Sequence, residues 1–172
     1  MNQVEYFGRG PAENYLDRNA GSMIGLYKST AEELYFPYVR PQENGHHTDT
    51  RWVSLSTGKK GLLIQADNTI GFKALRNSIE DFDDEEATGL PRQWSNFTPE
   101  QVANHDEAAA KNVLRRQHHI NDITPRDFVE VCVDLKQQGV AGYDSWGSRP
   151  EPAYTLPANR EYNWGFTLIP LK

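Results

Sequence analysis

Cysteine is almost absent from this sequence of 172 residues, and its scarcity excludes two classes of small protein. The single thiol, Cys132, cannot close a disulfide within the chain and cannot build a cysteine-rich zinc site. It lies in an alternating apolar run, where a small buried side chain is its ordinary role. A hydrophobic core must therefore stabilise the fold, and 172 residues with 37% hydrophobic side chains suffice for one domain over residues 1–172.

Long apolar runs and clustered positive charge are also missing. No stretch approaches the roughly 18–20 apolar residues that cross a bilayer, which predicts that a membrane is not a partner. The formal net charge is −6 and the few lysine and arginine pairs form no basic stripe, which predicts that nucleic acid is not a partner. Residues 1–8 have neither a basic start nor an apolar core, so they do not resemble a signal peptide.

What the sequence does contain is alternation with a period of two. Residues 128–135 alternate valine and leucine with acidic residues, and residues 162–168 alternate aromatic residues and leucine with small or polar ones. Both patterns are typical of half-buried strands. Weaker strand signals occupy residues 4–8, 34–40, 50–56, 61–66 and 70–76. Because turn sequences rather than helices separate them, we expect an all-β fold, an antiparallel β-sandwich or barrel.

One segment carries a helix signal. Thr98 is an N-cap residue, Pro99 suits the first helical position, and Gln101 can reach back to the cap N–H. Alanines follow, and Arg115-Arg116 suit a helix C-terminus, so we expect a short helical insertion near residues 99–116. The acidic run at residues 80–86 lacks the spacing of a calcium loop and is interpreted as a solvated loop.

The acidic side chains show no pair of the kind that acid–base hydrolysis requires. Glu32-Glu33, Glu43 and Glu151 are isolated from one another in sequence, so no catalytic residue is assigned to this chain. No arrangement of residues matches a metal-ligand motif either, so no metal and no cofactor are assigned to it.

Histidines form two small clusters, His46-His47 with Asp49 and His118-His119 with Asp122. Adjacent residues on a strand point to opposite faces, so only one histidine of each pair can face a given site. A structural role is favoured for both clusters. The alternative is that His47 acts as a general base that Asp49 orients.

The sharpest local feature is the run Gly142-Tyr143-Asp144-Ser145-Trp146-Gly147, in which a tryptophan follows a glycine-rich turn. An indole on a loop is costly to leave exposed unless something covers it. The apolar C–H face of a sugar ring suits an indole plane, while the sugar hydroxyls need polar neighbours such as Asp144 and Ser145. A buried core tryptophan is the equally weighted alternative.

Three segments together resemble a known family, the large bacterial β-galactosidases of glycoside hydrolase family 2. The first is Tyr6-Phe7-Gly8-Arg9-Gly10-Pro11-Ala12-Glu13-Asn14-Tyr15-Leu16-Asp17-Arg18. The second is Tyr38-Val39-Arg40-Pro41-Gln42-Glu43-Asn44-Gly45 with the downstream Arg51, and the third is Asp144-Ser145-Trp146. All three occur in the family's order, between residues 6 and 146.

The resemblance implies the C-terminal part of a β-sandwich called a supersandwich, similar to galactose mutarotases. It implies a retaining enzyme that hydrolyses terminal β-galactosides such as lactose, with its catalytic Glu pair in a separate barrel upstream. It places Trp146 as a platform for the sugar or aglycone, and on that basis we expect Asp144 and Ser145 to hold its loop. A secondary cluster of candidate site residues comprises Glu43, Asn44, His47 and Arg51.

The resemblance also implies partners. They are a galactoside or other carbohydrate, the remaining domains of the parent enzyme, and further copies in a homo-oligomer. Mg and Na would sit near the barrel of the parent, which would reside in the cytoplasm or periplasm. The family domain is longer than this chain, and residues 80–122 are longer and more charged than their counterpart, so His118 and His119 receive no role.

Two alternatives belong to other classes of function. One is a non-catalytic carbohydrate-binding or assembly domain, in which Trp146 is buried at a contact. The other is an aldose 1-epimerase, which needs a histidine and a carboxylate in one cleft, with His47 as the first candidate.

Overall fold

The computed structural model describes residues 1–82, 120–144 and 146–172, and its contacts divide the chain into two compact units. The first unit comprises Met1–Phe36, Asn44–Asn77 and Pro125–Lys172, and the second comprises Pro37–Glu43 with Ser78–Thr124. The described strands all belong to the first unit, which also carries the tryptophan loop. The helix expected near 99–116 lies outside the described residues.

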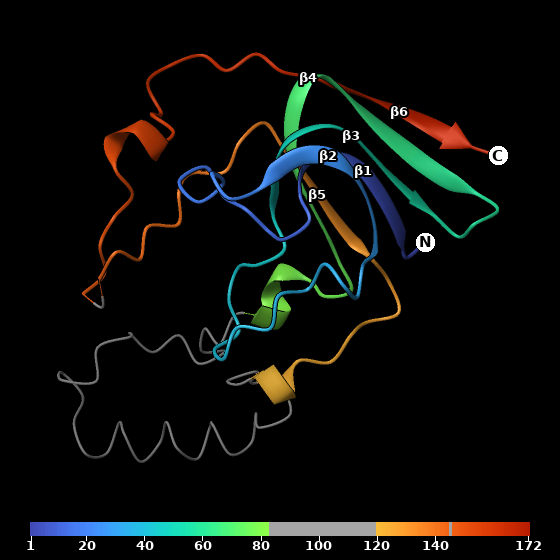
Figure 1. Cartoon of the computed structure of the whole chain (residues 1–172), viewed down its shortest axis with the longest axis horizontal. Coiled ribbons are helices and arrows are strands. Elements are labelled where there is room, and N and C mark those ends of the chain that lie inside the picture. The colour runs from blue at the N-terminus through green and yellow to red at the C-terminus, as the bar shows by residue number, and fades with distance from the viewer. Residues whose placement is uncertain (83–119, 145) are drawn as a thin grey trace. The chain divides into compact units, whose positions relative to one another are not determined.

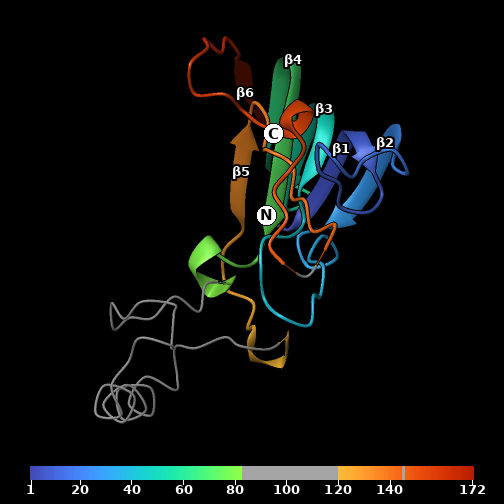
Figure 2. The same ribbon diagram turned by 90° about the vertical axis from the view of Figure 1, so that its left-hand side faces the viewer.

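Six antiparallel strands form one sheet in the order β2-β1-β3-β4-β5, with β6 pairing β4 (Figures 1 and 2). Their bounds are β1 Gln3–Gly10, β2 Met23–Thr30, β3 His47–Ser56, β4 Gly61–Leu75, β5 Glu130–Asp134 and β6 Phe166–Leu171. The predicted all-β antiparallel fold is confirmed, and the sheet is consistent with one layer of a β-sandwich. Helical structure among the described residues is limited to three short 3-10 turns, η1 Ile79–Phe82, η4 Ile120–Asp122 and η5 Pro152–Tyr154. None of these residues forms a helix long and apolar enough to cross a membrane.

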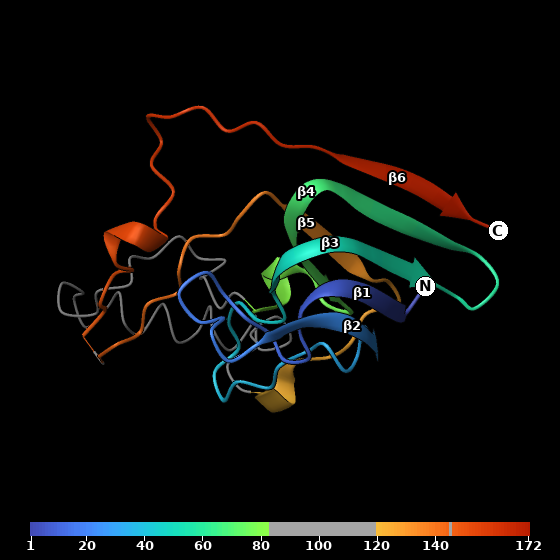
Figure 3. The same cartoon turned by 45° about the horizontal axis from the view of Figure 1, so that its top comes forward.

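β4 is the long strand of the sheet and changes partner along its length. Gly61 to Ala66 pair with β6, whereas Gly71 to Leu75 pair with β5 (Figure 3). The sequence predicted two strands here, over 61–66 and 70–76. The structure joins them through Asp67-Asn68-Thr69, which pair with neither β5 nor β6, so polar residues that suit a turn instead connect the two halves of one strand.

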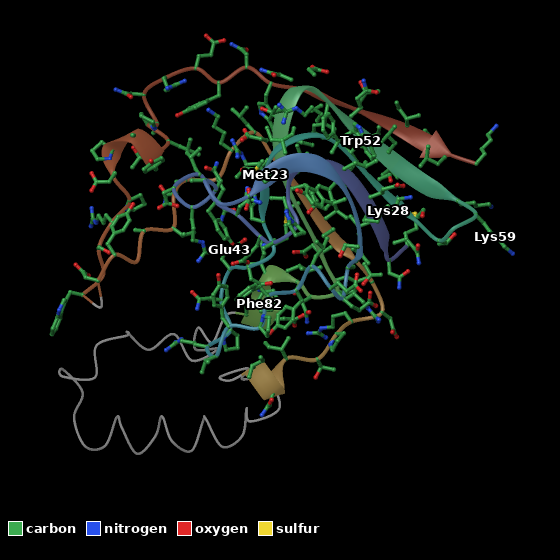
Figure 4. The ribbon with its side chains drawn as sticks, in the orientation of Figure 1. Met23, Lys28, Glu43, Trp52, Lys59 and Phe82 are labelled. Carbon is green, nitrogen blue, oxygen red and sulfur yellow. The ribbon has the colours of Figure 1, made fainter. Side chains whose placement is uncertain are left out.

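Alternate residues of β1 face the core, as the period of two requires, whereas every residue of β4 from Ile70 to Leu75 is buried. Tyr6 is central, because its ring lies against Tyr27, His47 and Phe72 at centroid distances of 5.3, 4.8 and 5.0 Å. The other buried strand side chains include Val4, Val53, Leu55, Ile64, Ile70, Ala74 and Leu75. The β3–β4 hairpin closes with Thr57 N–H donating to the Lys60 carbonyl at 2.9 Å, and Lys59 marks its tip (Figure 4).

The prediction of a strand over 34–40 is wrong. Ahead of it, Thr30 and Glu33 form a reciprocal pair: Thr30 N–H donates to Glu33 Oε2 at 3.0 Å and Glu33 N–H to Thr30 Oγ1 at 3.2 Å. This is the arrangement of a helix capping box, and it turns the chain at the end of β2. Pro37 and Pro41 then remove two backbone donors from any ladder.

Two further differences concern β6 and β2. The strand expected over 162–168 begins only at Phe166. The first residue of this segment that bonds to β4 is Gly165, whose carbonyl accepts from Asp67 N–H at 3.0 Å. β2 was not predicted. Its exposed Met23, Ile24 and Leu26 lack clear alternation with polar residues, which concealed the strand.

Candidate functional site

Asn14, from the first motif, is fully buried and uses its whole amide. Its Nδ2 donates to the carbonyls of Arg9 and Ala12, both at 3.1 Å. Its Oδ1 accepts from Thr48 N–H at 2.9 Å and from Thr48 Oγ1 at 2.6 Å. Asn14 therefore ties the end of β1 to β3, and a neutral side chain with both a donor and an acceptor is required there.

Glu13 joins the first motif to the second. Its side chain is 3% exposed, and Oε1 forms an ion pair with Arg18 at 2.6 Å. Its Oε2 accepts from Gly45 N–H at 2.7 Å. Gly45 has a φ of +75°, a conformation that favours glycine, and a Cβ there would lie 2.9 Å from the Leu34 carbonyl oxygen. Gly45 is thus fixed by backbone geometry as well as by Glu13.

Two adjacent buried histidines, His46 and His47, follow this segment. The His47 ring stacks on Phe72 at 5.1 Å, and its Nδ1 lies 3.0 Å from the Arg9 carbonyl oxygen. Burial lowers the pKa of His47 from 6.5 to about 4, against the opposing effect of that hydrogen bond. His46 stacks on Tyr15, and burial, followed by the nearby His47 and Lys73, lowers its pKa to about 3. Among the described atoms neither Nε2 has a hydrogen-bond partner.

These two histidines predict a loss of stability in mild acid. Their pKa in the folded chain lies below the ordinary 6.5, so the unfolded chain binds more protons below that pH. Stability is complete above about pH 6.5 and falls as the pH drops toward 4, by about 2 kcal/mol per histidine at pH 5. The measurement is the free energy of unfolding in urea at pH 7.5 and pH 5.

The matched control is His47→Gln, which removes one titrating group and should reduce the pH dependence by about 2 kcal/mol over the same range. Burial raises the pKa of Asp134, so this carboxyl makes the folded chain more stable as the pH falls, which opposes the effect of the histidines. Its contribution is the same in both proteins and cancels when their pH dependences are compared. Equal pH dependence in the two proteins would contradict the assignment.

The secondary cluster is not gathered around one cavity. Asn44 is buried, and its Oδ1 accepts from Phe36 N–H at 3.1 Å. His47 lies against Tyr6, whereas the Arg51 guanidinium lies 5.6 Å above the ring of Phe7, on the other face of β1. Glu43, also named in the cluster, belongs to the second unit, which is described by itself.

Trp146 is the most exposed large apolar side chain among the described residues, at 93%. Asp144 shapes its turn, because Oδ1 accepts from Trp146 N–H at 2.7 Å and from Ser148 N–H at 3.3 Å. Gly142 and Gly147 flank the turn, each with a φ of +82°. The loop thus presents the indole outward, and the alternative of a core tryptophan does not describe this chain. Ser145 lies outside the described residues.

Asp17, the penultimate residue of the first motif, was not singled out by the sequence. Its two carboxylate oxygens accept from Val140 N–H at 3.0 Å and Ala141 N–H at 2.8 Å. The Tyr143 hydroxyl lies 3.5 Å from Oδ2. The first motif therefore contacts the segment just before the third motif through Asp17, and a separation of more than 120 residues left no local signal of this contact.

A small pocket of about 80 Å³ lies beside β3 and β4, and its walls include His46, Thr48, Asp49 and Lys136. Asp49 adopts a φ of +52° and forms an ion pair with Arg9 at 2.5 Å. Within the described parts of the chain no three His, Cys, Asp or Glu side chains gather as metal ligands.

Comparison with known proteins gives a consistent match along the chain. A family model described as the β-galactosidase small chain matches residues 1–168. A β-galactosidase from Priestia megaterium is 34% identical over 172 residues, and one from Streptococcus thermophilus is 29% identical over 170 residues. These matches cover 99% and 98% of this chain but 14% of each relative, so the chain spans about one seventh of their length.

Proposed function

The chain belongs to the β-galactosidase small-chain family, and on that premise we propose that it supplies a sugar-stacking platform, Trp146, to the active site of a β-galactosidase. The remainder of the enzyme carries the catalytic Glu pair of a retaining mechanism and the Mg and Na sites. The substrate class is terminal β-galactosides such as lactose. The single observation that carries the proposal is the outward-facing indole on a turn that Asp144 holds.

The geometry suits a sugar for physical reasons. A flat indole offers an apolar face to the C–H groups of a pyranose ring, while the sugar hydroxyls keep hydrogen-bonding partners around it. The stacking lowers the free energy of the bound sugar and forms no covalent bond, so Trp146 contributes to binding and orientation. Proton transfer and glycosyl transfer remain with the two carboxylates of the catalytic domain.

The exposed face of the sheet supports assembly with a larger protein. Leu26 of β2, Phe7 of β1 and Trp52 of β3 are directly opposite one another in the strand register, so they form one apolar row across three strands. Leu26 and Phe7 are exposed (Trp52 is labelled in Figure 4). Apolar rows of this kind are usually covered in a working protein. We infer that other domains of the parent enzyme cover this row.

The proposal is tested by titrating the chain with methyl β-galactoside and recording tryptophan fluorescence. We expect a saturable change at millimolar concentrations, because a single stacking platform with few hydrogen bonds corresponds to a binding free energy of about −4 kcal/mol. Trp146→Leu should abolish the change. Trp164→Phe is the matched control, because Trp164 is also exposed, and it should keep the change. A response that survives in Trp146→Leu would contradict the proposal.

The epimerase alternative receives less support from the histidines. His47, its first candidate, is buried, and the pKa of about 4 makes it a weak base. His46 does share a pocket with Asp49, but its pKa is about 3. Accelerated mutarotation of fresh α-galactose, followed by polarimetry, would favour the epimerase.

A further inference from the structure

The segment that leads into the tryptophan turn lies directly against Asp17. Gly139 N–H donates to the Tyr154 carbonyl at 2.8 Å, which fixes the start of the segment. A Cβ at Gly139 would lie 2.5 Å from Asp17 Oδ2, so only glycine lets the backbone approach the carboxylate this closely. The next two residues, Val140 and Ala141, then donate their N–H groups to the two carboxylate oxygens.

This contact depends on the carboxylate group itself. Two successive N–H groups point the same way when one residue is left-handed, and Ala141 has a φ of +55°. Alanine rarely adopts that conformation, so an external acceptor has to hold it. Hydrogen bonds from N–H groups to an ionised carboxylate are stronger than those between neutral groups. Asp17 supplies both the external acceptor and the ionised carboxylate, and each of its oxygens receives one backbone N–H.

The third contact reaches the residue just before the turn. A phenol is protonated at neutral pH, so the Tyr143 hydroxyl can donate to Asp17 Oδ2 at 3.5 Å. Tyr143 N–H in turn donates to Ser148 Oγ at 2.9 Å, on the far side of the turn. A continuous set of hydrogen bonds therefore runs from Asp17 to both ends of the turn that carries Trp146.

We propose that Asp17 is a positioning residue for the Trp146 platform: it fixes residues 139–143 and thereby sets where the indole stands. The proposal rests on the proposed function of Trp146. Gly142 and Gly147, both at a φ of +82°, bound the turn, and apart from the adjoining residues no atom of the described residues lies within 4 Å of the Cβ position at either. The Glu151 backbone also bonds to Tyr143, but Asp17 alone among the described residues bonds to Val140, Ala141 and Tyr143 together, so we assign the direction of the turn to this anchor.

The test uses the complete β-galactosidase that contains this chain, with the variants Asp17→Ala and Asp17→Asn. Asp17→Ala removes both acceptors, and we expect KM for a chromogenic galactoside to rise about threefold to tenfold with kcat changed less. Asp17→Asn keeps one acceptor oxygen, so KM should rise less in this variant than in Asp17→Ala. Asp127→Asn is the matched control, because this fully exposed carboxylate has only a 3.6 Å ion pair with Arg76, and it should leave KM unchanged.

A double-mutant cycle separates positioning from general stability. In the Trp146→Ala enzyme the platform is gone, so adding Asp17→Ala should change KM no further. Hydrogen exchange gives a second readout: the amides of Val140 and Ala141 should exchange about tenfold faster in Asp17→Ala, as expected when a hydrogen bond is lost.

Each outcome decides between the two proposals. An unchanged KM in Asp17→Ala, in an enzyme whose KM rises with Trp146→Ala, would overturn the positioning role of Asp17. Equal effects of Asp17→Ala with and without Trp146 would overturn it as well. An unchanged KM in Trp146→Ala would instead overturn the proposed function of the tryptophan, whatever the exchange of the Val140 and Ala141 amides shows.

Discussion

We expect Trp146→Ala, in the complete β-galactosidase proposed above, to raise KM for galactosides about tenfold and to leave the fold intact. Stacking of an aromatic side chain on a ring contributes about 1–3 kcal/mol by analogy with stacking on nucleobases, which corresponds to a factor of roughly 5 to 150 in affinity. The fold should survive because the side chain is 93% exposed, so its removal leaves no cavity. Steady-state kinetics gives KM, and thermal unfolding of the variant checks the fold.

Transfer of galactose to a sugar acceptor should weaken together with substrate binding, because the platform also suits the aglycone. Trp146→Phe keeps a smaller apolar face and should fall between the two enzymes. Trp164→Phe removes another exposed indole and should behave as the unmodified enzyme. Unchanged KM and unchanged transfer in Trp146→Ala would show that the indole has no contact with the sugar.

Much of the sheet was predictable because its signals are local. Alternation places Tyr6, Val53 and Ile64 on the core-facing side, and all three are buried. The strand over 34–40 failed for a local reason too: the pattern Thr30-x-x-Glu33 is a capping signal, and it outweighs the aromatic residues that follow. β6 begins later than predicted for a non-local reason. A strand over residues 162–164 would need a neighbouring strand to pair with, and β4 pairs with this segment only from Phe166 to Leu171.

The candidate site was predictable only in part. The glycine-flanked run singled out Trp146 but left an exposed and a buried indole equally weighted, and only the structure shows the exposed side chain and the Asp144 oxygen that accepts its N–H. The partners of Asn14 could not be derived in this way, because Thr48 lies 34 residues away in the sequence. Asp17 and Ala141 are still farther apart, and only the folded chain reveals that a carboxylate of the first motif holds the loop of the third.

The buried histidines illustrate a different limit. The sequence favoured a structural role for the cluster of His46, His47 and Asp49, and the stacking of both rings on aromatic neighbours agrees with that interpretation. The sequence did not indicate that both imidazoles would be held neutral. That property depends on burial, which arises from the packing of β1, β3 and β4 rather than from the residues beside them.

The central claim is that this chain completes a β-galactosidase site without holding a catalytic pair of its own. Complementation tests it most directly. The chain is mixed with the Priestia megaterium β-galactosidase truncated just before its matching region, and each piece is assayed alone on a chromogenic β-galactoside. The relative covers 99% of this chain, so the two pieces together supply every matched segment. The account predicts hydrolysis in the mixture only. Hydrolysis by the chain alone would contradict it, because the carboxylates of this chain would then have to perform the reaction.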